Sequence, residues 1–140
     1  KTINDSIVTS KGELQSARNS FFAALHVIRQ PFDLLNDNVQ LTLKEDMQYN
    51  DRSCYVVEVG YDGDNADADK WSYIIDKESF DVVANKVVLK DHTSWVENLT
   101  FDTSTDFKFN AHRKSYRLNE KGEKTYLRAE YFYTNFSVSY

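Results

Sequence analysis

The sequence is poor in several residue types, and each shortage excludes a class of structure or partner. Its one cysteine, Cys54, has no second thiol with which to form an internal disulfide. One proline and four glycines among 140 residues leave little room for a disordered linker. No hydrophobic run approaches the ~20 residues of a membrane-spanning helix. The net charge of −5 argues against nucleic acid or an anionic membrane as a partner.

Aromatic residues, in contrast, are abundant. Nine Phe, nine Tyr and two Trp make up 14% of the chain, while the hydrophobic content of 41% and the charged content of 28% are ordinary for a globular protein. A chain of this length suits one domain and buries roughly 70% of the surface that its unfolded state exposes. We therefore expect a single domain over residues 1–140.

One helix is predicted near the N-terminus. Ser10 and Glu13 have the spacing of a capping box, in which a hydroxyl and a carboxylate satisfy the free amides of the first turn. Apolar residues then recur at spacings of three and four, at Leu14, Ala17, Phe21, Leu25 and Ile28. Pro31 cannot continue a helix. This pattern predicts a helix over residues 11–29.

After Pro31 the apolar period changes to two, which indicates β-strands. The alternating positions are Val39, Leu41, Leu43; Tyr55, Val57, Val59, Tyr61; Trp71, Tyr73, Ile75; Val83, Val87, Leu89; Phe107, Phe109; Tyr116, Leu118; Leu127, Ala129, Tyr131, Tyr133; and Phe136, Val138, Tyr140. Such alternation is typical of antiparallel strands with one dry and one wet face. Polar turns are expected at 50–52, 76–79 and 119–122. The fold class is therefore α+β, mainly β, a meander sheet whose apolar face is covered by the helix.

The acidic stretch YDGDNADADKWSYIID, residues 61–76, is the nearest thing to a chemical motif. An EF-hand loop needs oxygen ligands at positions 1, 3 and 5, and Gly at position 6. Counted from Asp62, position 5 is Ala66; counted from Asn65, position 6 is Lys70. Both frames fail, so we expect a solvated hairpin connection, with a weak cation site as the alternative.

No other group of residues has the spacing of a catalytic or metal site. His26 falls inside the predicted helix, and His92 and His112 have no metal-like neighbours. The basic run 112–117 is expected to be a solvated face. The sequence contains no nucleophile elbow, P-loop or dinucleotide fingerprint. It therefore assigns no catalytic residue, metal ligand or cofactor.

A longer pattern of motifs, spread over most of the chain, resembles that of a known family. It consists of an aromatic helix, Pro-Phe-x-Leu, a strand, a polar turn, Tyr-Val-Val-x-Val, an acidic loop and an aromatic strand, followed at the end of the chain by RKSYRLNEKGEKTYLRAEYFYTNFSVSY. Over residues 21–89 and 113–140 the chain resembles an uncharacterised family of envelope proteins from Bacteroidota. Segment 90–112 does not fit the pattern, so its role stays open.

That family is similar in architecture to the lipoprotein carriers LolA and LolB, in which a strongly curved antiparallel sheet wraps over helices. The resemblance implies a protein of the periplasm or cell envelope, with lipid anchoring left open, that binds a lipid or another hydrophobic ligand. The ligand-binding candidates are Phe21, Phe22, Leu25, Trp71 and Tyr73. In the family a strand-rich segment precedes the helix. We therefore expect this chain to be the C-terminal part of a longer domain, with a free sheet edge that permits self-association.

Three classes of function stay open at this point. The first is a non-catalytic, exported protein that binds a hydrophobic ligand, which the aromatic content favours. The second is a structural or interaction module that docks a partner chain through its sheet face or edge. The third is an enzyme of unrecognised type. A lined, continuous apolar cavity favours the first class, a flat exposed aromatic patch favours the second, and clustered buried titratable groups favour the third.

Overall fold

The computed structural model describes residues 2–3, 6–7, 10–29, 32–63 and 68–138. The chain divides into two compact units, Lys1–Asp33 and Leu34–Tyr140. The single domain expected from the sequence stays a prediction, because each unit is described by itself.

The first unit contains one helix, and its bounds agree with the sequence prediction. Two short strands, β1 (Thr2–Ile3) and β2 (Ser6–Ile7), pair antiparallel ahead of α1 (Lys11–Arg29). Ser10 caps the helix as predicted, because the Glu13 amide donates to Ser10 Oγ at 3.3 Å. The Glu13 carboxylate accepts from the Ser10 hydroxyl at 2.5 Å, whereas a full capping box joins it to the Ser10 amide. Pro31, the predicted terminator, lies outside the described residues. The docking of this helix on the sheet stays a prediction.

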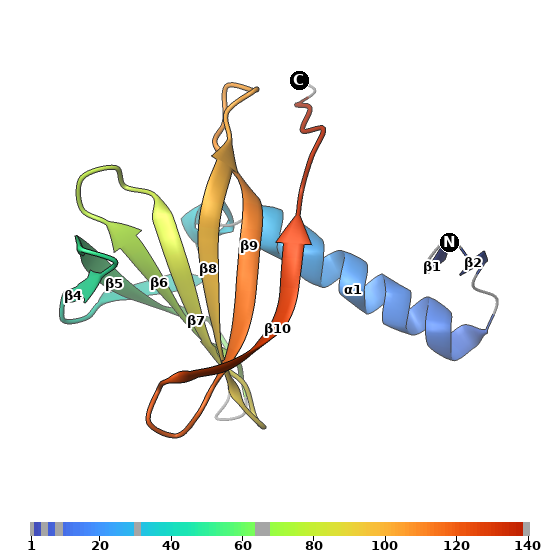
Figure 1. Ribbon diagram of the computed structural model, residues 1–140, viewed down its shortest axis with the longest axis horizontal. Coiled ribbons are helices and arrows are strands. Elements are labelled where there is room, and N and C mark those ends of the chain that lie inside the picture. The colour runs from blue at the N-terminus through green and yellow to red at the C-terminus, as the bar shows by residue number, and fades with distance from the viewer. Residues whose placement is uncertain (1, 4–5, 8–9, 30–31, 64–67, 139–140) are drawn as a thin grey trace. The chain divides into compact units, whose positions relative to one another are not determined.

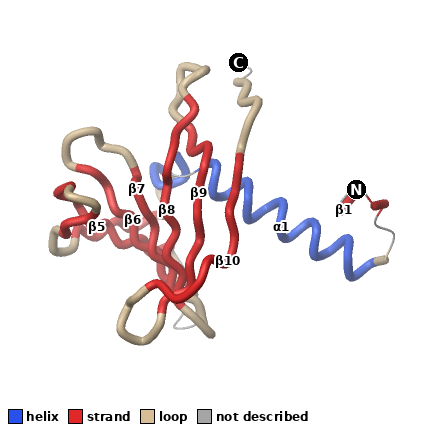
Figure 2. Tube along the Cα trace, viewed as in Figure 1, coloured by secondary structure: helices blue, strands red, loops and turns tan. Residues whose placement is uncertain are grey.

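The second unit is an eight-stranded antiparallel sheet, as the mainly β, meander fold class requires (Figures 1 and 2). A short 3₁₀ helix, η1 (Phe32–Leu35), precedes it. The strands are β3 (Val39–Leu43), β4 (Met47–Tyr49), β5 (Arg52–Tyr61), β6 (Lys70–Asp76), β7 (Val82–Val88), β8 (Thr93–Asp102), β9 (Phe109–Leu118) and β10 (Lys124–Phe132). Their order is β10-β9-β8-β7-β6-β5-β3, and β4 also pairs with β5. The sheet is open and curved, and neighbours in sequence are neighbours in space.

The structure differs from the strand predictions in the second half of the chain. Segment 90–112, whose role the sequence left open, contains β8, which pairs with β7 and β9. Its buried positions include Ser94 and Asn98, so apolar alternation does not reveal it. The expected last strand at Phe136, Val138 and Tyr140 is absent over residues 133–138, and Tyr140 lies outside the described residues. Phe107 precedes β9 rather than lying within it.

The three predicted turns are confirmed, and each depends on local polar chemistry. Asn50 and Asp51 have φ of 48° and 62°, the left-handed pair that a two-residue hairpin needs. The Asp76 carboxylate accepts from the amide of Glu78 at 2.8 Å. Asn119 Oδ1 accepts from the amides of Lys121 at 3.0 Å and Glu123 at 2.9 Å, which closes the β9–β10 turn.

Both faces of the sheet carry buried side chains, so the expectation of one dry and one wet face is wrong. Residues paired across neighbouring strands share a face. The register therefore defines a Trp71 face, with Val59, Tyr73, Val82, Asn85, Asn98 and Arg113, and a Trp95 face, with Cys54, Ile74, Ala84, Trp95, Glu97 and Leu118. In β7 all four residues of the run Val82–Asn85 are buried, which requires that both faces of the strand are covered.

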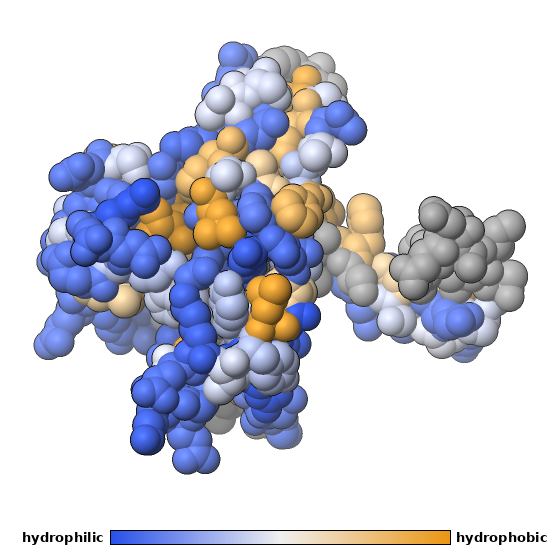
Figure 3. All heavy atoms as spheres, viewed as in Figure 1, coloured by the Kyte–Doolittle hydropathy of each residue, from blue (hydrophilic) through white to orange (hydrophobic). Residues whose placement is uncertain are grey.

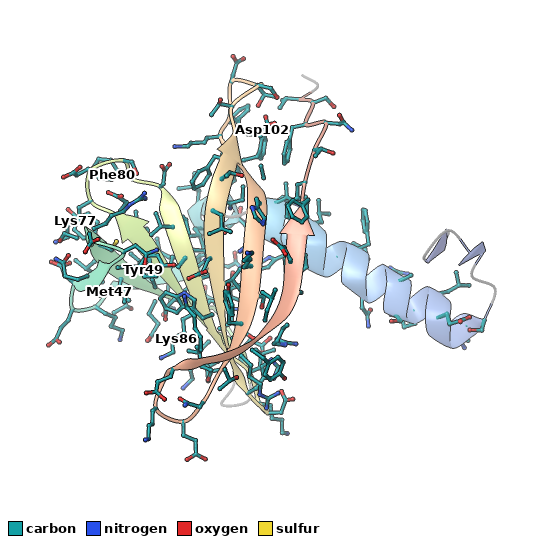
Figure 4. All side chains as sticks on the ribbon, viewed as in Figure 1. Met47, Tyr49, Lys77, Phe80, Lys86 and Asp102 are labelled. Carbon is teal, nitrogen blue, oxygen red and sulfur yellow. The ribbon has the colours of Figure 1, made fainter. Side chains whose placement is uncertain are left out.

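Each face has its own hydrophobic cluster. On the Trp95 face, Met47 and Tyr49 of β4, both labelled in Figure 4, belong to one cluster. They pack against the buried Cys54, Ile74 and Trp95. On the Trp71 face, Leu34 and Val39 pack against Val59, Tyr73 and Val82. Full burial of one such side chain stabilises the fold by about 1.5–3 kcal/mol.

Phe80 at the β6–β7 connection (Figure 4) is a strained position that can be tested directly. It has φ of 58° and is 70% exposed, so little packing offsets its left-handed backbone. We expect Phe80→Gly to be more stable than Phe80→Ala by about 1 kcal/mol, because only glycine adopts this conformation without steric cost. Chemical denaturation of the two variants measures the difference. Equal stability, or a more stable alanine variant, would contradict the left-handed conformation.

Candidate functional site

The most unusual group on the Trp71 face is a buried guanidinium. Arg113 of β9 is only 2% exposed. Its Nε donates to Asn98 Oδ1 at 2.6 Å, and its Nη2 donates to Asn85 Oδ1 at 3.0 Å. Asn98 Nδ2 in turn donates to the carbonyl oxygen of Val82 at 2.5 Å. The arginine is therefore held by side chains from two other strands.

Strand register brings these residues together. Arg113 lies directly opposite Asn98 of β8 on one side and opposite Tyr131 of β10 on the other. Asn85 of β7 lies opposite Tyr73 of β6. Across β8, Asn85 lies opposite Val96, two residues from Asn98, so Asn85 is a diagonal neighbour of the Asn98–Arg113 pair. Directly opposite and diagonal side chains on one face are close enough to interact, so the register gathers residues far apart in sequence.

This arrangement corrects the prediction for the basic run 112–117. Because side chains alternate along β9, the run divides between the two faces: Arg113 and Ser115 are buried on the Trp71 face. On the other face, His112 Nε2 is 2.7 Å from Glu130 Oε1, and Lys114 Nζ is 3.6 Å from the same oxygen. The run is thus not a solvated face, and Arg113 is the residue that sequence reasoning missed.

Arg113 carries its charge without a carboxylate. None of the ion pairs among the described residues includes it. Burial lowers the pKa of Arg113, and the neighbouring Tyr133, Tyr131 and Tyr73 oppose that shift. A guanidinium stays protonated at neutral pH even so. The site is therefore a buried positive charge stabilised by two amide oxygens and flanked by tyrosines.

The same face becomes apolar away from Arg113. Over β5, β6 and β7 it carries the buried Val59, Tyr73 and Val82, and the half-buried Trp71 stacks on Tyr73 with ring centroids 6.5 Å apart. Over β8 and β9 it is polar instead, with Ser94, Asn98, Arg113 and Ser115 buried. The Trp71 face therefore has an aromatic half and a polar, positively charged end.

The five predicted ligand-binding residues lie in both units. Trp71 and Tyr73 are together on the Trp71 face, and Tyr73 is also one of the tyrosines near Arg113. Phe21 and Phe22 contact each other edge-on at 5.7 Å and are 59% and 50% exposed, and Leu25 is half-buried. That these three helix residues share a ligand with Trp71 and Tyr73 stays a prediction.

The Trp95 face holds a second ionisable cluster, in which every group has a partner. Tyr49 donates to Glu97 Oε1 at 2.8 Å, and Lys124 forms an ion pair with the same carboxylate. Burial, followed by the hydrogen bond to Glu97, raises the pKa of Tyr49 to about 12. A phenol with so high a pKa is a poor base at neutral pH, so the cluster is suited to structure rather than to proton transfer.

The histidines and the cysteine are not arranged for nucleophilic catalysis. His92 Nδ1 lies 2.7 Å from Asp91 Oδ1, while its Nε2 lies 2.7 Å from Arg128 Nη1. Arg128 Nη1 also donates to Ser94 Oγ at 2.7 Å. The arginine therefore lies between the His92 imidazole and the Ser94 hydroxyl, which contact each other directly in a catalytic triad. Burial raises the pKa of the Cys54 thiol, which disfavours the reactive thiolate.

Two acidic places bear on the alternative of a weak cation site. The acidic stretch does connect β5 and β6, which confirms a hairpin connection, but residues 64–67 lie outside the described part of the chain. A hollow of about 480 Å³ at the β6–β7 turn is lined by Asp51, Asp76, Glu78 and Asp81, among others. Asp76 is already engaged by the Glu78 amide and by Arg52. No described group of three His, Cys, Asp or Glu residues is placed to hold a metal ion.

Figure 3 shows one side of the molecule, on which hydrophobic residues of the sheet unit form separate patches between hydrophilic ones. Among the described residues, no helix combines the length and the apolar character that a membrane crossing requires. Comparison with models of known families, with curated proteins and with solved structures finds no match to this chain.

A mutant cycle tests whether Asn98 and Arg113 depend on each other. We expect Asn98→Leu to cost about 3 kcal/mol of unfolding free energy, because it removes an acceptor from a buried charge. In an Arg113→Met background the same change should cost less than about 1 kcal/mol, since no charge is left to solvate. Urea denaturation of the four proteins measures the coupling. Additive effects would show that the two side chains do not interact.

The pKa of Tyr49 can be measured by following tyrosinate absorbance as the pH is raised. We expect one group to titrate near 12 in the wild type and to be missing in Tyr49→Phe. Because the folded pKa exceeds the value of about 10 in unfolded chains, this group stabilises the fold below pH 10, and the contribution is lost between pH 10 and 12. Glu97→Gln should bring the pKa part of the way back, since burial remains. An unchanged pKa in Glu97→Gln would exclude the hydrogen bond as a cause.

Proposed function

We propose that this chain is a non-catalytic binding protein that holds a lipid or another hydrophobic ligand against the Trp71 face of its sheet. One observation carries the proposal: large apolar side chains stay exposed on this face beside its aromatic cluster. Leu41 and Leu43 of β3 are 53% and 64% exposed, and they lie opposite Val59 and Val57.

Exposure of this kind has a physical consequence. Each Å² of apolar surface removed from water contributes roughly 25 cal/mol, so a ligand that covers these leucines gains affinity directly. Exposed apolar surface next to a buried aromatic cluster is typical of binding sites for apolar molecules or protein partners.

The ionisable groups support binding rather than catalysis. In the Tyr49–Glu97–Lys124 cluster the phenol and the ammonium group both contact Glu97 Oε1, and both ring nitrogens of His92 contact a neighbouring side chain. Localisation in the periplasm or cell envelope belongs to the proposal as well, and it rests on the family resemblance in the sequence.

The edge of the sheet favours a second candidate, an interaction module. β10 is at one end of the strand order, so within the described sheet only β9 pairs with it. Four of its large side chains are exposed: Tyr126 at 55%, Leu127 at 45%, Tyr131 at 41% and Phe132 at 68%. A partner chain, including a second copy of this one, can add a strand to such an edge.

An uncharged probe tests the first proposal. We expect hexadecan-1-ol to bind the wild type and to change the fluorescence of Trp71. Leu41→Lys should weaken binding about tenfold, because it places a charge on the apolar surface. Val88→Lys is the matched control, since Val88 is 38% exposed on the Trp95 face; its affinity should equal that of the wild type.

Two results would contradict this assignment. The first is equal weakening by Leu41→Lys and Val88→Lys, which would place the alcohol elsewhere. The second is no binding at all together with concentration-dependent dimerisation that Leu127→Lys abolishes, which would favour the β10 edge as the functional surface.

A further inference from the structure

We propose that the ligand of the Trp71 face is a long-chain fatty acid whose carboxylate is recognised by Arg113. This inference rests on the proposed function and adds the chemistry of the ligand's head to it. The observation behind it is the juxtaposition of a buried guanidinium, which lacks a carboxylate among the described residues, with an aromatic apolar surface on the same face.

The guanidinium of Arg113 has more N–H donors than its two hydrogen bonds use. An arginine offers five N–H groups in a rigid fork, and the hydrogen bonds to Asn98 and Asn85 use two of them. Asn85 supplies a further sign of an absent partner: it is 1% exposed, and its Nδ2 has no acceptor among the described residues. Buried donors are normally satisfied, so the Asn85 amide beside the guanidinium indicates a missing acceptor.

The charge of the site selects a monoanion. A buried ion without a counterion is costly, by several kcal/mol even after relaxation. One carboxylate neutralises one guanidinium, whereas a phosphate monoester brings a second negative charge. The other arginines on this face are engaged: Arg117 donates to the carbonyl oxygen of Asp91 at 3.0 Å, and Arg128 bonds to Ser94 and His92. The flat fork of Arg113 also matches the two oxygens of a carboxylate.

The dimensions of the face suit a long acyl tail. Arg113 lies on β9, and the aromatic half of the face begins at β7 and extends to Val59 on β5. Four strand spacings of about 4.8 Å separate β9 from β5, or roughly 19 Å, close to the length of an extended long acyl chain. The carboxylate is therefore placed at the polar end and the tail over Tyr73, Trp71 and Val59.

The test compares two ligands that differ only in their heads, hexadecanoic acid and hexadecan-1-ol. Tryptophan fluorescence gives the Kd of each for the wild-type protein at neutral pH. We expect the acid to bind at least about tenfold more tightly than the alcohol, because a charge-assisted hydrogen bond in a buried site contributes at least that much.

Substitutions test whether Arg113 is the residue that causes the preference for the acid over the alcohol. Arg113→Met should bind the acid no better than the alcohol while it keeps its affinity for the alcohol. Arg117→Met is the matched control on the same strand and face, and it should keep the full preference. If Arg113→Met does not fold, Arg113→Lys retains the charge without the fork and should show a reduced preference for the acid.

Each outcome decides one claim. A wild-type protein that binds both ligands equally overturns the carboxylate inference and leaves the hydrophobic-ligand proposal standing. Binding of neither ligand overturns both. A preference for the acid that is lost in Arg117→Met and kept in Arg113→Met assigns the head to another residue and also overturns the inference.

Discussion

The pairing of β7, β8 and β9 depends on how the buried charge of Arg113 is stabilised. A guanidinium that is 2% exposed requires acceptors, and the fold provides them by placing Asn98 and Asn85 on the two preceding strands in the correct register. A shift of one residue in β8 would move Asn98 to the other face and leave the charge without its closest acceptor. The hydrogen bonds to Arg113 therefore specify how β7, β8 and β9 pair, in addition to any role in binding.

The two faces of the sheet differ in how their charged groups are stabilised. On the Trp95 face, Met47 and Tyr49 of β4 pack against the cluster that contains the buried Trp95. The Glu97 carboxylate accepts a hydrogen bond from Tyr49 and forms an ion pair with Lys124. On the Trp71 face, apolar side chains stay exposed at β3, and a positive charge is buried without a carboxylate among the described residues. A surface that is apolar at one end and cationic at the other is complementary to an amphipathic anion. The exposed side chains of β10, among them Tyr131 opposite Arg113, belong to the second candidate function, association with another chain.

Local sequence patterns predict the helix and strands whose signals come from residues close together in sequence. The capping box at Ser10 and the apolar spacing that follows it predicted α1, and period-two alternation predicted β3, β5 and β6. β8 was missed because three of its four buried positions are polar, Ser94, Glu97 and Asn98, and their burial is possible only through partners on other strands. For the same reason Arg113 was assigned to a solvated run: its acceptors are 15 and 28 residues away in sequence, and only the register shows that they meet. Of the candidate site, Trp71 and Tyr73 were predictable, but the charged end was not.

The central claim is that this fold retains a hydrophobic monoanion. Native mass spectrometry of the protein, purified under mild conditions and incubated with a slight excess of hexadecanoic acid, tests it most directly. The account predicts one adduct per chain, with the mass of the fatty acid, that survives desalting and is released on denaturation. A spectrum that contains only the bare chain under these conditions would contradict it.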